Sequence, residues 1–359
     1  MTLLLTTVCL VAMAYQLAAL LACLRHLARK ETPADFQPPV SILKPVRGLD
    51  PGFDEAIASH ASQRYPDFEI LFGVSRDDDP AIPVIERLED ARLYRTNPTA
   101  PNTKVGVLEE LSRHARHGIL LVNDSDIRVP QGYLAAVVAP LADPRVGLVT
   151  CLYRATAHSF PGIWEAVGIA TDFAPSTLVA PLAGVKEFGL GSTLVFRKQD
   201  LEAIGGFFSI ASYLADDYQL ATRITGLGKR VHLSTVVVET SLQAESWRDI
   251  WRHQLRWHRT IRVSRGAYAG LPVTQATLWA LVAAIAGLPA LAAMLLFTRL
   301  TMAFIAGIVV LRCPLVKRWF WITPLRDLWG VAVWAAGLFG STVLWRGQSI
   351  RLTADGRIL

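Results

Sequence analysis

Two aspartates, Asp124 and Asp126, directly follow the apolar run Ile119–Val122. Four consecutive apolar residues indicate a buried strand, and carboxylates at positions i and i+2 of an extended chain point to the same side. In open α/β sheets, ligands bind beyond the carboxyl ends of the strands. Such a pair of carboxylates would suit Mg²⁺ or Mn²⁺, which prefer oxygen ligands. The alternative is that both aspartates only form the turn after the strand.

Further acidic groups stand at the ends of other predicted elements. Three aspartates follow the apolar run 68–74, again at the carboxyl end of a predicted strand. A second pair lies near the start of a helix predicted in 213–224, where the helix dipole favours negative charge. A purely structural capping role is the alternative for this pair. The residues concerned are Asp77, Asp78, Asp79, Asp216 and Asp217.

The elements that would position these carboxylates alternate between strand and helix. The sequence predicts strands at 40–43, 68–74, 91–95, 119–122, 146–153 and 191–196, with helical segments such as 104–114 between them. This alternation indicates an α/β fold with a parallel or mixed sheet covered on both faces. No Gly-x-Gly-x-x-Gly follows the first strand, and no Gly-x-x-x-x-Gly-Lys-Ser/Thr occurs. A metal held by carboxylates is therefore the expected means of binding phosphate.

Several apolar stretches predict membrane spans. Of the 359 residues 52% are hydrophobic, and the mean hydropathy of +0.34 is high for a soluble protein. Residues 1–24 carry no charge and precede basic residues, which favours a retained anchor whose carboxyl end is cytoplasmic. The stretch 275–311 is either a hairpin turning near Leu288-Pro289 or near Arg299, or one span followed by a half-buried segment. With 328–345 as a last span, the sequence predicts three or four spans.

Charge and cysteine content exclude some classes of function. The four cysteines include no Cys-x-x-Cys pair, so neither a disulfide framework nor a zinc site is indicated. The net charge of +6 is concentrated beside the apolar stretches, where anionic lipid explains it more simply than nucleic acid. We therefore expect a membrane partner and no nucleic acid.

Two segments predict contact with the membrane surface. The apolar segment 160–187 is expected either to lie against the membrane or line a lipid-facing cleft, or to be an ordinary buried helix and loop. The segment 247–265 carries six arginines and a partly apolar face that includes tryptophans. This pattern predicts an interfacial amphipathic helix whose arginines reach lipid or ligand phosphate.

Taken in order, the motifs resemble those of inverting, family-2-like glycosyltransferases with a GT-A fold, which is a Rossmann-like mixed sheet. More narrowly they are similar to the ceramide glucosyltransferase family, and to its bacterial branch that includes the hopanoid-biosynthesis enzyme acting on bacteriohopanetetrol. The likeness covers roughly residues 40–270. The motifs are Ser41-Ile42-Leu43-Lys44-Pro45, Asp78-Asp79-Pro80-Ala81, Asp124-Ser125-Asp126-Ile127-Arg128-Val129, Val146-Gly147-Leu148-Val149, Leu214-Ala215-Asp216-Asp217-Tyr218 and His253-Gln254-Leu255-Arg256-Trp257.

The resemblance implies a role for each polar residue. Asp217 would be the general base, tuned by Asp216, and Asp126 with Asp124 would hold Mg²⁺ or Mn²⁺. One of Asp77, Asp78 and Asp79, with Asp78 favoured, would bind the uracil or ribose. Lys104 would face the nucleotide, or else be a surface lysine. Arg256 would grip phosphate and Trp257 would wall the pocket, whereas His253 stands where the family has Gln or Arg.

The predicted organisation is an anchor at 1–24, a linker at 25–39, a GT-A domain at 40–240, an amphipathic segment at 241–272, a transmembrane region of two or three spans at 273–346 and a tail at 347–359. The expected activity is metal-dependent, inverting transfer from a UDP-sugar, with UDP-N-acetylglucosamine favoured, to a hopanoid hydroxyl at the cytoplasmic face of the bacterial inner membrane. The alternatives are a ceramide glucosyltransferase using UDP-glucose or a related UDP-sugar, a processive polysaccharide synthase and a non-catalytic nucleotide-binding scaffold.

Overall fold

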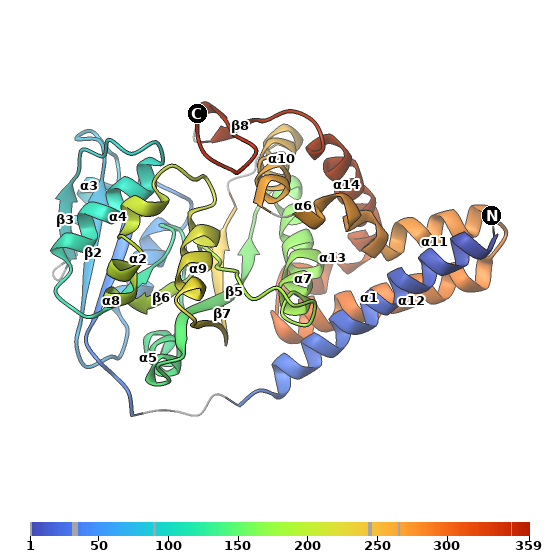
Figure 1. Ribbon diagram of the computed structural model, residues 1–359, viewed down its shortest axis with the longest axis horizontal. Helices are drawn as coiled ribbons and strands as arrows, with labels where there is room; N and C mark the ends of the chain where they lie inside the picture. Colours follow the sequence, from blue (N-terminus) through green and yellow to red (C-terminus); the bar gives the residue numbers. More distant parts are fainter. Residues whose placement is uncertain (1, 31–34, 89–90, 243–245, 265, 346) are drawn as a thin grey trace.

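A sheet-containing part and a helical part make up the protein (Figure 1). The computed structural model describes residues 2–30, 35–88, 91–242, 246–264, 266–345 and 347–359. Outside the described residues lie 1, 31–34, 89–90, 243–245, 265 and 346. These are small portions of the predicted anchor, linker, GT-A domain, amphipathic segment and transmembrane region.

A seven-stranded mixed sheet forms the centre of the first part. Its order is β3-β2-β1-β4-β6-β5-β7. The first four strands in this order are parallel, β6 is antiparallel to both β4 and β5, and β7 is parallel to β5. The strands are β1 Val40–Val46, β2 Phe68–Val74, β3 Ala91–Arg95, β4 Ile119–Val122, β5 Val146–Thr156, β6 Leu194–Arg197 and β7 Arg230–Ser241. The predicted strands are all present, and β7 is an additional one.

Successive side chains of the strands face opposite layers, as the pleat requires. Ile42 of β1 belongs to one core and Leu43 to the other. Apolar residues from two sets of helices complete these cores and cover both faces. One set is α2 Phe53–Ala61, α3 Ile82–Ile85, α5 Tyr133–Val138 and the short η1 Ala139–Ala142; the other is α4 Thr103–His114, α8 Lys198–Ala203, η3 Phe207–Ile210 and α9 Asp216–Gly226.

The helical part contains segments from both ends of the chain. Helix α1 packs against α11 and α12, and these three extend together away from the sheet (Figure 1). The elements are α1 Thr2–Ala28, α6 Phe160–Gly168, the π-helix η2 Ile169–Phe173, α7 Ala174–Val179, α10 Trp247–Ser264, η4 Gly266–Thr274, α11 Ala276–Ile285, α12 Pro289–Phe304, the π-helix η5 Ile305–Val310, α13 Pro314–Trp319, η6 Phe320–Ile322, α14 Thr323–Gly337 and the hairpin β8 Thr342–Trp345 and β9 Gln348–Arg351.

Within the residues that the structure describes, two helices are long and apolar enough to cross a membrane, namely Thr2–Ala28 and Pro289–Val310. A bent pair, Tyr268–Thr274 with Ala276–Ile285, would make a third span if it acts as one. The stretch 275–311 forms a helical hairpin that turns at Gly287-Leu288, which agrees with the turn predicted near Leu288-Pro289 and not with the one near Arg299. Arg299 within it is neutralised by a bidentate ion pair with Asp327, at 2.6 and 2.9 Å.

The last predicted span, 328–345, is wrong as a continuous helix. Helix α14 ends at Gly337, and residues 342–345 form β8. The physical reason lies in α10: Arg259 donates to the carbonyl oxygens of Phe339 and Thr342, and Arg262 donates to those of Leu338 and Gly340. These carbonyls, which a longer helix would use internally, are held by guanidinium groups instead. Two of the six arginines predicted to reach lipid or phosphate therefore bind backbone.

Candidate active site

A cavity of about 840 Å³ lies where the carboxyl ends of β4 and β7 meet the helical part. The chain positions its lining through loops that follow β4, precede β6 and begin α9, together with one face of α10. Most of the predicted site residues converge on it. The predicted residues that line the cavity are Lys104, Asp124, Asp126, Asp216, Asp217, His253, Arg256 and Trp257.

The loop after β4 is fixed by backbone hydrogen bonds on two sides. The N–H of Asp124 donates to the carbonyl of Gly191 at 3.2 Å. A reciprocal backbone pair joins Arg128 to Glu239 of β7, at 2.8 and 2.9 Å. The carboxylate of Asp126 accepts the hydroxyl hydrogen of Thr240, also in β7. Strand β7, which was not predicted, therefore orients the second aspartate of the pair.

Asp126 is an unusually basic aspartate. Burial, followed by the negative charge of Asp124 and a smaller contribution from Asp50, raises its pKa to about 6. The hydroxyl of Thr240 only partly opposes this change. The surrounding side chains leave part of the negative charge of Asp124 and Asp126 unneutralised. A divalent cation would balance it.

Lys104 occupies the centre of the acidic group rather than the surface. Its ammonium Nζ lies 2.8 Å from Asp124 Oδ1 and 3.1 Å from Asp216 Oδ2, and its side chain is 17% exposed. Burial acts against the charged form, but the two carboxylates outweigh it and raise the pKa of Lys104. The alternative of a surface lysine is therefore wrong, since this cation joins the two acidic motifs.

Lys44, near the carboxyl end of β1, holds the loop after β4 through a backbone carbonyl. It is fully buried, and its Nζ donates to the backbone carbonyl of Asp124 at 3.3 Å. Burial lowers the pKa of Lys44 to about 7, although the charges of Asp126 and Asp124 oppose the change. The Lys44-Pro45 motif thus positions the aspartate loop.

Asp217 is held by backbone donors at the start of α9. Its Oδ2 accepts the N–H of Gly191 at 3.1 Å, and its Oδ1 accepts the N–H of Tyr218 at 2.7 Å. Gly189 must be glycine here, because a Cβ would lie 2.7 Å from the carbonyl oxygen of Asp217. Burial and the charge of Asp216 raise the pKa of Asp217 to about 6, against the effect of Lys104. Such a carboxylate is charged at neutral pH and basic enough to accept a proton.

The Arg-Trp box projects from α10 into the opposite side of the cavity. His253 Nδ1 lies 2.7 Å from Glu165 Oε1, and its ring contacts that of Trp257 with centroids 4.6 Å apart. Trp257 also meets Phe173, with centroids 6.0 Å apart. Sequence reasoning missed Glu165; the signal that could have found it is a single acidic residue within the apolar helix 160–168. The part of the segment 160–187 up to residue 180 is mostly buried and contributes to the cavity wall, whereas residues 181–184 are exposed.

The acidic residues after β2 lie apart from this lining. Asp79 is buried and shapes a turn by accepting the N–H groups of Gly48, at 2.9 Å, and Ala81, at 3.0 Å. Asp78 is exposed and forms a bidentate pair with Arg76, at 2.8 and 2.9 Å. Asp77 is exposed and lies 3.6 Å from a guanidinium nitrogen of Arg95.

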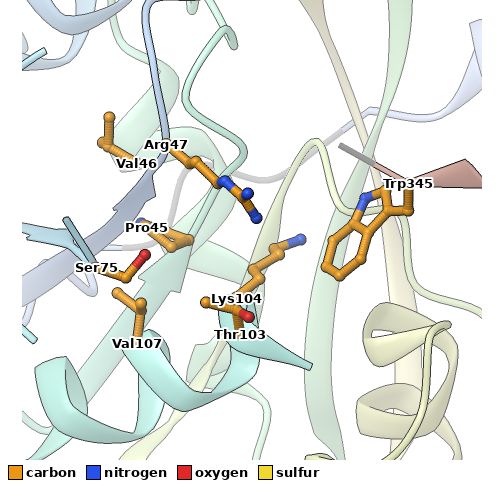
Figure 2. A pocket seen from close by; sticks show the side chains of 8 residues that line it. All are labelled: Pro45, Val46, Arg47, Ser75, Thr103, Lys104, Val107 and Trp345. Atoms are coloured by element: carbon orange, nitrogen blue, oxygen red, sulfur yellow. The ribbon is translucent and has the colours of Figure 1, made fainter. Parts of the chain in front are cut away.

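A smaller pocket adjoins the end of β2. Ser75 and Arg47 line it on one side, and Figure 2 shows the side chains of Arg47 and Lys104 pointing into the same space, with the Trp345 indole across from them. Lys104 and Trp345 also line the large cavity, so the two spaces adjoin. A role of Asp77, Asp78 or Asp79 in nucleotide binding stays a prediction.

A metal ion would find only part of its coordination sphere in this chain. Among the residues that the structure describes, no group of three or more His, Cys, Asp and Glu side chains could hold one. Two carboxylates that carry excess negative charge still fit a divalent cation whose other ligands are water and substrate phosphates. Asp124 and Asp126 are therefore suited to a metal that arrives with a diphosphate.

Known proteins similar to this chain are glycosyltransferases. Ceramide glucosyltransferase 1 of Caenorhabditis elegans is 29% identical over 219 residues, which cover 58% of this chain and 47% of that protein. The ceramide glucosyltransferase of Komagataella phaffii is 34% identical over 113 residues, which cover 28% of this chain and 22% of that protein. The chain thus spans less than half the length of these relatives.

A solved structure shares the fold. The mannosyltransferase PcManGT of Pyrobaculum calidifontis, solved with GDP-Man and Mn²⁺, superposes with a TM-score of 0.54 at 19% identity, over 93% of this chain and 97% of that one. This likeness confirms the GT-A architecture. The model of glycosyl transferase family 21 matches residues 4–358, and the protein accordingly belongs to that family.

Proposed function

We propose that the protein transfers a sugar from a UDP-sugar to the hydroxyl of a membrane lipid, with inversion at the anomeric carbon. One observation carries the proposal: the partly buried, basic carboxylate of Asp217 shares a cavity with the acidic pair Asp124 and Asp126 and with the Arg-Trp box. The first group suits proton removal, the second a metal-bound diphosphate. Together they match what the displacement of a nucleoside diphosphate requires.

The donor would lie across the adjoining pockets. Its diphosphate would lie in the large cavity and its nucleoside would extend toward the end of β2, where Asp78 or Asp77 would bind the uracil or ribose. Asp126, with Asp124, would hold Mg²⁺ or Mn²⁺, which balances charge on the leaving diphosphate. Arg256 would bind the same phosphates through its planar guanidinium. The Mn²⁺ in the PcManGT complex supports a metal at this site without distinguishing it from Mg²⁺.

The acceptor hydroxyl would enter from the side of α10 and lose its proton to Asp217. Asp216 would keep the pKa of Asp217 high by its charge and keep Lys104 in place. A positioned base contributes about 10²–10⁴-fold to such a reaction. Trp257 would form the apolar wall against which the sugar or the lipid packs.

The identity of sugar and lipid is the finer part of the proposal. The motifs Leu214-Ala215-Asp216-Asp217-Tyr218 and His253–Trp257 resemble the hopanoid branch, which favours UDP-N-acetylglucosamine and a bacteriohopanetetrol-type acceptor at the cytoplasmic face of a bacterial inner membrane. The similar curated proteins are ceramide glucosyltransferases, which supports ceramide with UDP-glucose as the second candidate. A polysaccharide synthase is disfavoured, because the described residues offer only two or three spans for a polymer channel.

The test is transfer by the purified, full-length protein in detergent. Radiolabelled UDP-N-acetylglucosamine and UDP-glucose would each be incubated with bacteriohopanetetrol, with ceramide and with a bacterial lipid extract, in Mg²⁺ or Mn²⁺. We expect a single-sugar glycolipid of inverted configuration, formed by the wild type and abolished by EDTA. Absence of a glycolipid under every condition, or a polymeric product, would refute the proposal.

A further inference from the structure

Glu165 is a buried carboxylate in a helix that is otherwise apolar. It is the one ionisable residue of α6, and only 1% of its surface is exposed. Burying an unpaired carboxylate is strongly unfavourable, so this placement requires a partner. The partner is His253, whose Nδ1 lies 2.7 Å from Glu165 Oε1.

The other carboxylate oxygen, Oε2, has no hydrogen-bond partner in the described part of the chain. Buried polar atoms without partners are rare in native structures and require a reason. Glu165 and His253 both line the large cavity. The pKa of Tyr153 is raised by burial and then by the charges of Glu165 and Asp217. Glu165 therefore borders the same chamber as the proposed base, Asp217.

Part of the wall beside this pair is apolar, although arginines of α10 also line the cavity. Ile169, Phe173 and Leu242 line the cavity together with Trp257, whose ring lies against that of His253. A hydrogen-bond acceptor bordered by such walls suits an amphiphile that has a donor in its head group and hydrocarbon next to it. A free sugar would leave the apolar side chains without a partner.

We propose that Glu165 and His253 form the head-group site for the lipid acceptor. Through Oε2, Glu165 accepts a hydrogen bond from a second donor of the lipid, an amide N–H or a hydroxyl, beside the hydroxyl that is glycosylated. His253 engages Oε1 and so fixes the orientation of the carboxylate. The inference rests on the proposed function, and it adds a chemical requirement that an acceptor must meet.

The test compares Glu165→Gln with Glu202→Gln, a matched control in α8 whose side chain is exposed. The probes are a short-chain ceramide and its N-methyl derivative, and an alkyl tetrol and its derivative methylated at the hydroxyls beside the attacked one. Hydrogen bonds to charged groups are stronger than neutral ones. We therefore expect Glu165→Gln to raise, by about tenfold, the KM for whichever unmethylated acceptor the enzyme uses. KM for the UDP-sugar should stay within twofold, and Glu202→Gln should match the wild type.

The methylated probes provide a second test through their KM values. In the wild type, the methylated probe should show a comparable rise in KM, and Glu165→Gln should add little to it. An unchanged acceptor KM in the variant, or an equal rise in the KM for the UDP-sugar, would overturn the inference while leaving the proposed function intact. If the wild type glycosylates none of the four probes nor any lipid of the panel above, the proposed function is refuted and this inference falls with it.

Discussion

Replacing Asp217 by asparagine tests the proposed mechanism most directly. The substitution keeps the volume of the side chain but removes the charge and the ability to accept a proton. Loss of a positioned base costs about 10²–10⁴-fold in kcat, which is roughly 3–5 kcal/mol of transition-state stabilisation. Both carboxylate oxygens accept backbone N–H groups, from Gly191 at 3.1 Å and Tyr218 at 2.7 Å. The amide nitrogen must face one of these donors, so we also expect a loss of about 1–3 kcal/mol in stability.

The pH profile separates these two effects. The base works only when it is deprotonated, and burial together with the charge of Asp216 raises the pKa of Asp217 to about 6. Activity of the wild type should therefore be constant above this pH and fall about tenfold per unit below it. The control Asp216→Asn removes a charge that raises the pKa, so its acidic limb should move to lower pH.

The assay is initial-rate transfer to the lipid acceptor between pH 4.5 and 8 (roughly the range in which a carboxylate and its neighbours titrate), with thermal melting of each variant measured in parallel. We expect Asp217→Asn to remain folded and, at a Mn²⁺ concentration high enough to outcompete protons at Asp126, to lose the limb near pH 6 along with most of its activity. A folded Asp217→Asn variant that retains more than about a tenth of the wild-type kcat and the same acidic limb would refute the assignment of the base.

Three further outcomes follow from the geometry. Asp126→Asn should weaken Mn²⁺ binding in the presence of UDP at least about tenfold, as measured by calorimetry. In the wild type, the affinity for Mn²⁺ should fall as pH drops through about 6, because the raised pKa of Asp126 lets protons compete with the metal. An affinity unchanged by the substitution would exclude Asp126 as a ligand. Lys104→Met should lower kcat, whereas the control Lys198→Met should not, because Lys198 donates to the carbonyl of Ala115 outside the cavity lining and only Lys104 of the two joins both acidic motifs; equal effects would contradict this. Gly191→Ala should reduce activity at nearly normal stability, because its Cβ would lie 3.0 Å from Asp124 Oδ2; full activity would show that the loop can shift.

The sequence predicted those parts of the fold that depend on local pattern. The uninterrupted apolar run Ile119–Val122 located β4, which is buried throughout, and mostly apolar runs located β1 and β2. Strand β3 was also predicted, although it is a partly exposed strand at the edge of the sheet. Strand β7 escaped because its polar residues, among them Glu239 and Thr240, interrupt the run, although its many β-branched residues favour a strand. Thr240 lines the cavity and holds Asp126, whereas its neighbour Glu239, whose side chain points to the other face of the strand, pairs with Arg128.

What the sequence did not predict depends on contacts between distant segments. Nothing local distinguishes Lys104 from a surface lysine, since its two partners lie in other elements. The end of α14 is equally non-local, because Arg259 and Arg262 of α10 bind the carbonyl groups there. For Asp77, Asp78 and Asp79 the order of motifs indicated a region of the fold, and only the structure shows that Asp79 serves a turn.

The topology of the sheet explains how the proposed metal ligands and the proposed base are brought together. Because β6 runs antiparallel to β4, the residues that precede β6 lie at the carboxyl end of β4. Gly191 is one of them, and it accepts the N–H of Asp124 through its carbonyl while donating its own N–H to Asp217. A single residue thus links the two acidic motifs, which are separated by more than ninety positions in the chain. Backbone geometry, rather than flexible side chains alone, would therefore set the distance between a metal-bound diphosphate and the proposed base, and such rigidity is what in-line displacement requires.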